Sequence, residues 1–354
     1  MKCCLTVWLL AAATLAATAA DHGVILMYHH VDANTPAATS VTPAQFRRHL
    51  DFIEGNGFKV VPLQDLLAGV YGGEGVPDNA VAITFDDAYE SVHREALPEL
   101  ESRNMPFTVF VATRAVDRGY AGSLSWAQLR EMKASGLVTF GAHSVTHDHL
   151  LRGSEQGASE AWVARVAAEI DNSVARLEIQ LPGVAVRSFA YPFGEFSETL
   201  ADLVTRRELY GLGQQSGAVG GTTPRGAIPR FPMATPYAAT ERLATALNAR
   251  PLPVAQVEAG NALIAEGTEL PETMSFHLPK QRRYRRDQLA CYSTAGKPLT
   301  VTRESGRFTV ALPPLRPGRN KINCTAPSAE CAGEFFWYAR QWILADTAGN
   351  WLEY

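Results

Sequence analysis

The 354-residue sequence has little net charge, few cysteines and, after its first 20 residues, no long apolar run. A formal net charge of −4 argues against a general binder of nucleic acid or of anionic membranes. No segment beyond residue 20 is apolar over the length that a bilayer-spanning helix needs. The chain is nevertheless longer than one typical domain, so we expect a large core and an accessory module.

Only three cysteines follow residue 20, and all lie in the last quarter of the chain: Cys291, Cys324 and Cys331. In an exported protein we expect one disulfide and one free thiol. The short spacing favours Cys324 with Cys331, although the sequence alone leaves the pairing open.

Residues 1–20 have the pattern of a secretory signal peptide. Lys2 provides a minimal basic start, an apolar stretch runs from Leu5 to Leu15, and small residues before Asp21 offer a cleavage site. We therefore predict a secreted or periplasmic protein with no integral membrane segment after cleavage. The sequence leaves the oligomeric state open.

Two carboxylates, Asp86 and Asp87, end the apolar run 81–85, which has the composition of a buried strand. Neighbouring strand residues point to opposite faces, so both carboxylates serve one site only where the strand opens into its loop. In parallel α/β proteins, active sites are built at this end. The simpler alternative is helix capping by Asp87, with Glu90 completing a capping box.

A second polar cluster follows the apolar run 137–142. His143 and His147 are four residues apart, and two imidazoles with one carboxylate suit Zn²⁺ while leaving a fourth position for water. A third strand-like run, 189–194, is broken by proline and glycine. Three polar strand ends in this order predict one site.

Three segments together resemble signature motifs of the polysaccharide deacetylases, carbohydrate esterase family 4: Thr84-Phe85-Asp86-Asp87, His143-Ser144-Val145-Thr146-His147 and Tyr191-Pro192-Phe193-Gly194. The resemblance covers about residues 24–233, including the opening Leu26-Met27-Tyr28-His29 and the late segment 228–232.

The resemblance implies roles for individual residues. Asp86 is the expected catalytic base, and Asp87, His143 and His147 are the expected ligands of Zn²⁺ or of another divalent metal such as Co²⁺ or Ni²⁺. The backbone N–H of Phe193 is the expected oxyanion donor. Candidate substrate-binding residues are Trp126, Tyr191 and Pro192.

The sequence departs from the family pattern at three points, of which Asp148, at the position after the second histidine where proline is common, is harmless. Ala190 stands where an arginine commonly orients the base; Arg187 or, better placed, Arg230 could substitute. No histidine lies between His149 and His277, so the usual acid of the last motif has no match. The acid is then His29, His30, another group, or absent, a pattern also found among extracellular poly-N-acetylglucosamine deacetylases.

Strands and helices alternate through residues 21–250, which predicts an α/β domain. The resemblance implies that this domain is a distorted (β/α) barrel with seven strands. Residues 251–354 contain strands without intervening helices and predict a smaller β-sandwich-like domain. Its aromatic residues are candidates for sugar stacking, although packing is the commoner role: Trp337, Tyr338, Trp342 and Trp351. The basic run 280–286 favours a solvated loop; the alternative is a surface that binds an anionic polymer.

The resulting hypothesis is a secreted, metal-dependent N-deacetylase of an acetamido-sugar polymer. Poly-β-1,6-N-acetylglucosamine is the first expected substrate, followed by peptidoglycan or chitin oligomers. One alternative is a glycoside hydrolase, but adjacent Asp86 and Asp87 converge on one point rather than flanking a sugar. The other is a non-catalytic, metal-stabilised polysaccharide-binding protein.

Overall fold

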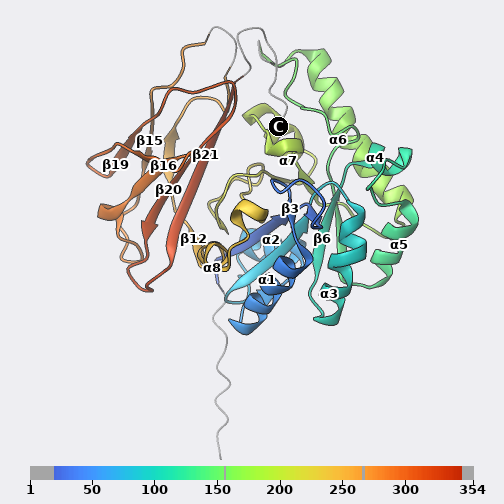
Figure 1. Cartoon of the computed structure of the whole chain (residues 1–354). Coiled ribbons are helices and arrows are strands. Elements are labelled where there is room, and N and C mark those ends of the chain that lie inside the picture. Colours follow the sequence, from blue (N-terminus) through green and yellow to red (C-terminus); the bar gives the residue numbers. More distant parts are fainter. Residues whose placement is uncertain (1–19, 155–156, 265–267, 345–354) are drawn as a thin grey trace, which may run out of the picture.

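The computed structural model describes residues 20–154, 157–264 and 268–344, and consists of a helix-covered barrel beside a two-sheet sandwich (Figure 1). Residues 1–19 of the expected signal peptide, and Trp351, lie outside the described residues. Within these ranges no helix is both long and apolar enough to cross a bilayer.

The barrel is a curled and mostly parallel sheet in which β10, β1, β5, β6, β7, β8 and β9 follow one another. Segment 225–232 closes it, because Ile228 bridges Leu212 on one side and β11 pairs with β1 on the other. The distorted barrel expected from the sequence is thus confirmed. Its strands are β1 (His22–Tyr28), β4 (Lys59–Val60), β5 (Ala80–Phe85), β6 (Phe107–Val111), β7 (Val138–Ala142), β8 (Ser188–Ala190), β9 (Tyr210–Leu212), β10 (Val219–Gly220) and β11 (Phe231–Pro232).

Helices cover the outside of the barrel (Figure 1). Capping boxes at Thr42 and Ser125 begin α1 and α5. Just before Pro98, a π-helical turn runs into α3. The helices are α1 (Pro43–Gly55), α2 (Leu63–Gly72), η1 (Val92–Ala96), α3 (Leu97–Ser102), α4 (Thr113–Arg118), α5 (Trp126–Ala134), α6 (Glu160–Gln180), η2 (Pro192–Gly194), α7 (Glu198–Thr205), η3 (Thr235–Tyr237) and α8 (Thr240–Leu247). A small parallel pair, β2 (His30–Val31) and β3 (Ser40–Val41), follows β1.

Strand alternation sorts the side chains of the barrel into two layers. On β5, Val81, Ile83 and Phe85 belong to the core beneath the helices, whereas Ala82 belongs to a separate cluster with Phe110 of β6. Asp86 is four residues after Ala82, so its side chain points to the same face of the strand as that of Ala82. The sequence therefore directs Asp86 to the interior of the barrel at the end of β5.

The C-terminal part consists of two sheets around a second core that includes Met274, Phe276, Phe308 and Trp342. One sheet has the order β12-β21-β20-β16-β17 with β14 beside β21, and the other has the order β13-β15-β19-β18. This confirms the expected strand-rich, sandwich-like part. Its elements are β12 (Ala249–Pro251), β13 (Ala255–Glu258), β14 (Leu263–Ile264), β15 (Thr273–His277), η4 (Arg286–Gln288), β16 (Ala290–Ser293), β17 (Pro298–Leu299), β18 (Val301–Glu304), β19 (Arg307–Ala311), β20 (Gly318–Pro327) and β21 (Phe335–Leu344).

The predicted domain boundary at residue 250 falls inside β12, which pairs in parallel with β21 of the first of these sheets. The boundary itself stays a prediction.

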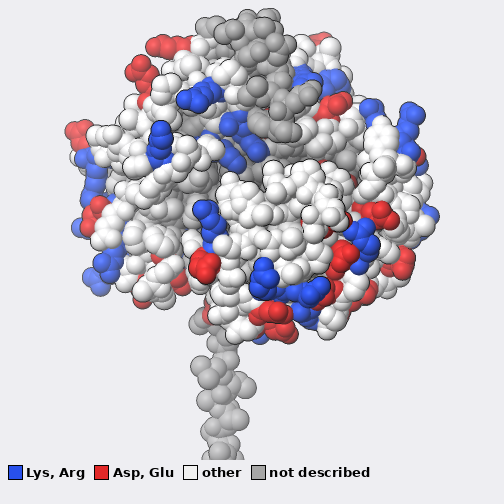
Figure 2. Space-filling view, viewed as in Figure 1, with Lys and Arg blue, Asp and Glu red and all other residues white. Residues whose placement is uncertain are grey.

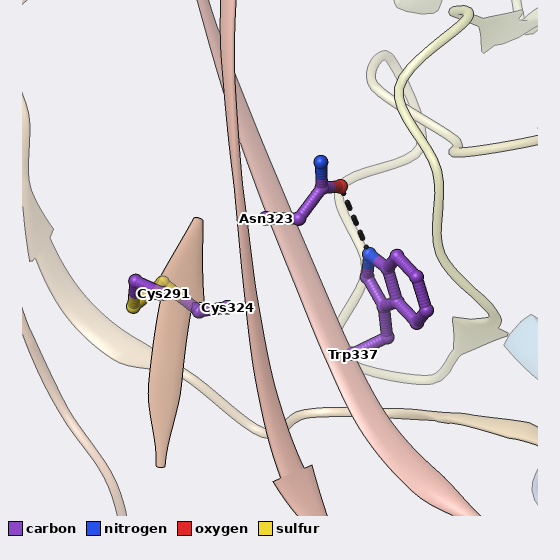
Figure 3. The surroundings of a disulfide bond; sticks show 4 residues. All are labelled: Cys291, Asn323, Cys324 and Trp337. Atoms are coloured by element: carbon purple, nitrogen blue, oxygen red, sulfur yellow. Dashed lines mark hydrogen bonds between the residues drawn. A yellow bond between two sulfur atoms is a disulfide. The ribbon is translucent and has the colours of Figure 1, made fainter. Parts of the chain in front are cut away.

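The disulfide joins Cys291 to Cys324, so the favoured pairing of Cys324 with Cys331 is wrong. Cys291 and Cys324 are direct cross-strand partners on β16 and β20, whereas β20 continues to Pro327 and carries the chain away before it reaches the exposed, free Cys331. Register, not closeness in sequence, decided the pairing. Figure 3 shows the disulfide on one side of the β20–β21 ladder and the Asn323–Trp337 hydrogen bond on the other.

Candidate active site

Three strand ends of the barrel bring polar residues to one place. Asp86 and Asp87 follow β5, His143 follows β7, and Tyr191 follows β8. β6 lies between β5 and β7, and β8 lies beside β7. Because the strands are parallel, these loops leave the sheet at the same end.

The loops carry a concentration of unusual backbone conformations. Five non-glycine residues in them have left-handed φ values: Asp87 (71°), Ala88 (56°), Ser144 (63°), His147 (59°) and Phe193 (56°). Such conformations are unfavourable for residues with a Cβ and persist where the surrounding structure holds them, often at functional sites.

Asp87, His143 and His147 form a compact ligand cluster. Asp87 Oδ1 lies 3.2 Å from His143 Nε2 and 3.0 Å from His147 Nε2, and the two imidazole nitrogens are 3.2 Å apart. Ligand atoms about 2.0–2.2 Å from a tetrahedral Zn²⁺ are separated by about 3.3–3.5 Å. The spacing and the mixed nitrogen and oxygen donors therefore fit one divalent metal ion.

Neighbouring groups orient these ligands. His143 Nδ1 lies 2.7 Å from the carbonyl of Ala190, so it donates there and leaves the lone pair of Nε2 available to a metal ion held beside Asp87. The Glu169 carboxylate on α6 accepts hydrogen bonds of 2.9 Å from the backbone N–H groups of Val145 and Thr146. Together these contacts hold the loop between the two histidines in place.

Arg230 and Asp86 form a buried, bidentate ion pair. Arg230 NH1 donates to Asp86 Oδ1 at 2.6 Å and NH2 donates to Oδ2 at 2.8 Å, and both side chains are 0% exposed. Burial alone would raise the pKa of Asp86, but the charge of Arg230, with a further contribution from His143, lowers it below the usual value of 3.8. Asp86 is therefore ionised at neutral pH.

The loop after β8 turns at Phe193 and Gly194, both of which have positive φ. The Phe193 ring stacks on His149 with centroids 4.0 Å apart and lies 4.7 Å from the ring of His147. Buried His149 in turn bonds through Nδ1 to Glu195 at 2.8 Å. Phe193 thus belongs to the wall of the metal cluster, on a support of two buried polar residues.

His29 and Tyr89 also lie near the two carboxylates. Burial lowers the pKa of His29 despite the opposing attraction of Asp87 and Asp86. The pKa of Tyr89 is raised, first by burial and then by Asp87, with which Tyr89 forms a side-chain hydrogen bond. His30 stacks on Tyr89 at a centroid distance of 3.6 Å. His29 therefore lies within electrostatic reach of Asp86 and Asp87, and His30 lies within reach of Asp87 while its ring stacks on Tyr89.

The family pattern described as Polysaccharide deacetylase matches residues 73–211, the segment that contributes Asp86, Asp87, His143, His147 and Phe193 to this site. The chain contains a polysaccharide deacetylase domain. It spans the barrel strands β5 to β9 and the loops that form the metal cluster.

Several relatives agree with this assignment. A poly-beta-1,6-N-acetyl-D-glucosamine N-deacetylase of Staphylococcus aureus (strain MRSA252) is 25% identical over 196 residues, which cover 54% of this chain and 67% of that protein. YxkH of Bacillus subtilis (strain 168), described as a polysaccharide deacetylase, is 25% identical over 123 residues, which cover 35% of this chain but only 42% of the relative.

Solved structures show the same fold as the deacetylase domain. IcaB from Ammonifex degensii is 27% identical with a TM-score of 0.54, and the match covers 62% of this chain and 95% of that one. The Streptococcus pyogenes deacetylase PplD is 23% identical with a TM-score of 0.56, covering 64% of this chain and 98% of that one. In both matches, more than a third of this chain lies outside the alignment.

Three residues expected to bind substrate have other surroundings in the deacetylase domain. Tyr191 is fully buried, and its hydroxyl donates to the carbonyl of Gly226 at 2.8 Å; Pro192 is buried as well. Trp126 lies in the outer helical layer, where its indole N–H donates to Asp117 at 2.8 Å and Arg176 covers its ring. Of the deacetylase motif at 191–194, Phe193 is the residue that faces the metal ligands.

Sequence reasoning missed the groups that support the site from a distance. Glu169 holds the histidine loop, and His149 with Glu195 supports Phe193. Two further groups come from the sandwich: Arg319 donates to the carbonyl of Phe193, and Gln341 donates to that of Gly194 at 2.9 Å. No local pattern around these residues indicates their partners, because each pairing depends on the tertiary fold.

Proposed function

We propose that this protein is an exported, metal-dependent hydrolase that removes N-acetyl groups from an acetamido-sugar polymer. The observation that carries the proposal is the arrangement of Asp86 beside the Asp87–His143–His147 cluster, with the charge of Arg230 keeping Asp86 ionised. Amide hydrolysis needs an activated water, a general base and support for the oxyanion. The arrangement supplies a residue for each requirement.

A divalent metal bound by Asp87, His143 and His147, for which Zn²⁺ is the first choice, supplies Lewis-acid chemistry that acidifies water and polarises a carbonyl. Asp86 accepts the proton of the attacking water, because its lowered pKa keeps it in the basic form. Arg230 fixes the plane of the Asp86 carboxylate by its two hydrogen bonds. Arg230 thus orients the base Asp86, a role that an arginine at the position of Ala190 commonly has in the family.

The backbone N–H of Phe193 is the proposed donor to the oxyanion. The left-handed turn at Phe193 and Gly194 and the stacked ring of His149 support this loop beside the metal ligands. His29 is the proposed acid for the departing amine. Its lowered pKa means that it is neutral at pH 7, so it must take up the proton that Asp86 has accepted from the attacking water before it donates this proton to the departing amine.

The proposed substrate is a poly-β-1,6-N-acetylglucosamine polysaccharide. The support is the name of the Staphylococcus aureus relative together with the absence, after residue 194, of a histidine within the barrel segment. Export to the periplasm or the outside, after cleavage near residue 20, is proposed from the character of residues 1–20 alone.

The test is acetate release from N-acetylglucosamine oligomers and poly-N-acetylglucosamine, measured with metal removed by a chelator and then restored as Zn²⁺ or Co²⁺. We expect metal-dependent acetate release with polymer length unchanged, and no release by an Asp86→Asn control. Shortened chains would instead indicate a glycoside hydrolase. Stoichiometric bound metal without acetate from any polymer would indicate a binding protein.

A further inference from the structure

A cavity of about 520 Å³ lies where the barrel meets the sandwich. One wall comes from β11, η3 and α8 of the barrel, and the other comes from β16, β20 and β21 of the sandwich. Figure 2 shows that, on the face in view, the boundary between the two parts is hollowed and has basic side chains along it. None of the expected catalytic residues or metal ligands lines this cavity.

Aromatic rings line the cavity from both sides. Tyr237 of the barrel and Tyr292 of the sandwich are 45% and 37% exposed, and they are two of the few large apolar side chains that the described residues expose. Trp337 also lines the cavity, packed edge-on against Phe231 and held by a 3.0 Å hydrogen bond from its indole N–H to Asn323. Rigid, half-exposed aromatic rings with polar neighbours are suited to the apolar faces and hydroxyl groups of sugars.

The charges of the lining have one sign. Arg242, which lies over the Tyr237 ring at 5.6 Å, carries a permanent positive charge, whereas burial lowers the pKa of Lys321 to about 7. No aspartate or glutamate is among the described lining residues. Neutral side chains provide the other polar groups: Ser216, Thr245, Ser293, Thr294, Asn323 and Thr325. A neutral, hydroxyl-rich ligand is compatible with this lining, whereas an ammonium group would meet like charge.

One strand connects the cavity to the active site. Alternate residues of β20 point to the same face, so Arg319, Lys321 and Asn323 all face the barrel. Arg319 reaches the carbonyl of Phe193, Lys321 donates to the carbonyl of Gln214 at 3.4 Å, and Asn323 lines the cavity. At about 3.3 Å per residue, Arg319 and Asn323 are roughly 13 Å apart, farther than one sugar ring extends.

We propose that this cavity is a second sugar-binding site, which holds a neutral, N-acetylated segment of the polysaccharide while another residue of the same chain lies at the metal cluster. The inference rests on the proposed deacetylase function for its ligand. In this proposal, the sandwich helps the enzyme to prefer long polymer chains that are still acetylated. Deacetylated segments, which carry ammonium groups, are repelled by the guanidinium of Arg242 and leave the cavity.

The test uses a β-1,6-linked N-acetylglucosamine hexamer, its dimer and the fully deacetylated hexamer as probes of the full chain. We expect the Tyr237→Ala/Tyr292→Ala double variant to bind the acetylated hexamer roughly tenfold more weakly, as measured by calorimetry. Its KM for the hexamer should rise by the same factor, which corresponds to about 1.4 kcal/mol of binding free energy. Turnover of the dimer and the kcat for the hexamer should not change. The Tyr237→Phe/Tyr292→Phe double variant keeps both aromatic rings and should bind the acetylated hexamer as the wild type does. Ile179→Ala, which shortens an exposed apolar side chain on α6, is the control for loss of apolar surface elsewhere.

The charge argument has its own variant. Arg242→Gln should increase the affinity for the deacetylated hexamer several-fold and leave that for the acetylated hexamer nearly unchanged. Failure of this shift would overturn the selectivity part of the proposal.

The outcomes separate this inference from the proposed function. If the wild type and the double alanine variant both release acetate with the same KM for the hexamer, the proposed second sugar site is wrong, whereas the proposed deacetylase function is supported. Tyrosine-dependent hexamer binding without acetate from any substrate would support the cavity and overturn the catalytic proposal.

Discussion

Arg319, on strand β20 of the sandwich, donates a hydrogen bond to the backbone carbonyl of Phe193 at the metal cluster of the barrel. The same guanidinium nitrogen also reaches Gln214 Oε1 at 3.0 Å, and Gln341 of β21 donates to the carbonyl of Gly194 at 2.9 Å. Two adjacent carbonyls of the proposed oxyanion loop are therefore held by the other part of the molecule. The sandwich thus supports the loop that carries the proposed oxyanion donor.

Removal of this support should reduce turnover without loss of metal. We expect Arg319→Ala to lower kcat by roughly 10- to 100-fold, because a displaced Phe193 N–H no longer faces the developing oxyanion. Metal content, measured by elemental analysis, should stay stoichiometric, because none of the three metal ligands lies in the sandwich. Arg316→Ala, an exposed arginine in the segment before β20, is the matched control. An Arg319→Ala protein with normal kcat would show that the loop needs no such support.

The Arg230–Asp86 pair can be tested by a double-mutant cycle. Arg230→Met leaves a buried carboxylate without its counter-charge and should lower the free energy of unfolding by about 3–5 kcal/mol. The pKa of Asp86 should then rise, so that the acidic limb of kcat/KM moves to higher pH. Asp86→Asn should abolish turnover, keep the metal and leave the arginine unpaired.

The Asp86→Asn/Arg230→Met double variant should recover stability relative to Arg230→Met, but not activity. Denaturation curves and pH–rate profiles give both readouts. Additive losses of stability in the double variant would contradict coupling between the two side chains.

Loss of a metal ligand should remove metal and turnover together. We expect His147→Ala and Asp87→Ala to reduce bound Zn²⁺ well below one ion per chain and to abolish acetate release, because two remaining ligands bind a divalent ion weakly. His277→Ala, a histidine of β15 in the sandwich, should change neither quantity. A His147→Ala protein that retains stoichiometric metal would exclude His147 from the ligand set.

Lys321 makes stability depend on pH. Burial, with a smaller effect of Arg319, lowers the pKa of Lys321 from 10.5 to about 7 in the folded protein. Between these two values the unfolded chain binds more protons than the folded chain, so stability rises with pH across this window and falls as pH drops to about 7. Lys321→Met should raise the free energy of unfolding by roughly 2–4 kcal/mol at pH 6.

The difference between Lys321→Met and wild type should shrink steadily above pH 7 and vanish near pH 10.5. Urea denaturation at several pH values provides the measurement. A difference that does not depend on pH would assign the effect to packing of the methionine instead of to the buried amine.

The disulfide predicts a contrast among the three cysteines. Cys291→Ser should lower the free energy of unfolding by about 3–4 kcal/mol, since the Cys291–Cys324 bond closes a loop with a sequence separation of 33 residues. Cys331→Ser should have little effect, because this residue is free and exposed. Equal losses from Cys331→Ser and Cys291→Ser would contradict the observed pairing.

Local sequence was sufficient for the elements and for the identity of the polar strand ends. Thr42 and Ser125 begin their helices with capping boxes, each of which involves residues only three apart. Likewise, the parity of β5 directs Asp86 inward, and the run before His143 is the strand β7. These features depend on neighbours within a few residues, and the chain specifies them directly.

Partners far apart in the sequence were decided only by the tertiary structure. Arg230 was one of two candidates beside Asp86 until the closed sheet brought together residues 144 positions apart. Strand register paired Cys291 with Cys324, the packing of the barrel buried Tyr191, and the position of the sandwich placed Arg319 against Phe193. Such contacts follow from which strands lie side by side and in which register, and local periodicity carries no information about either.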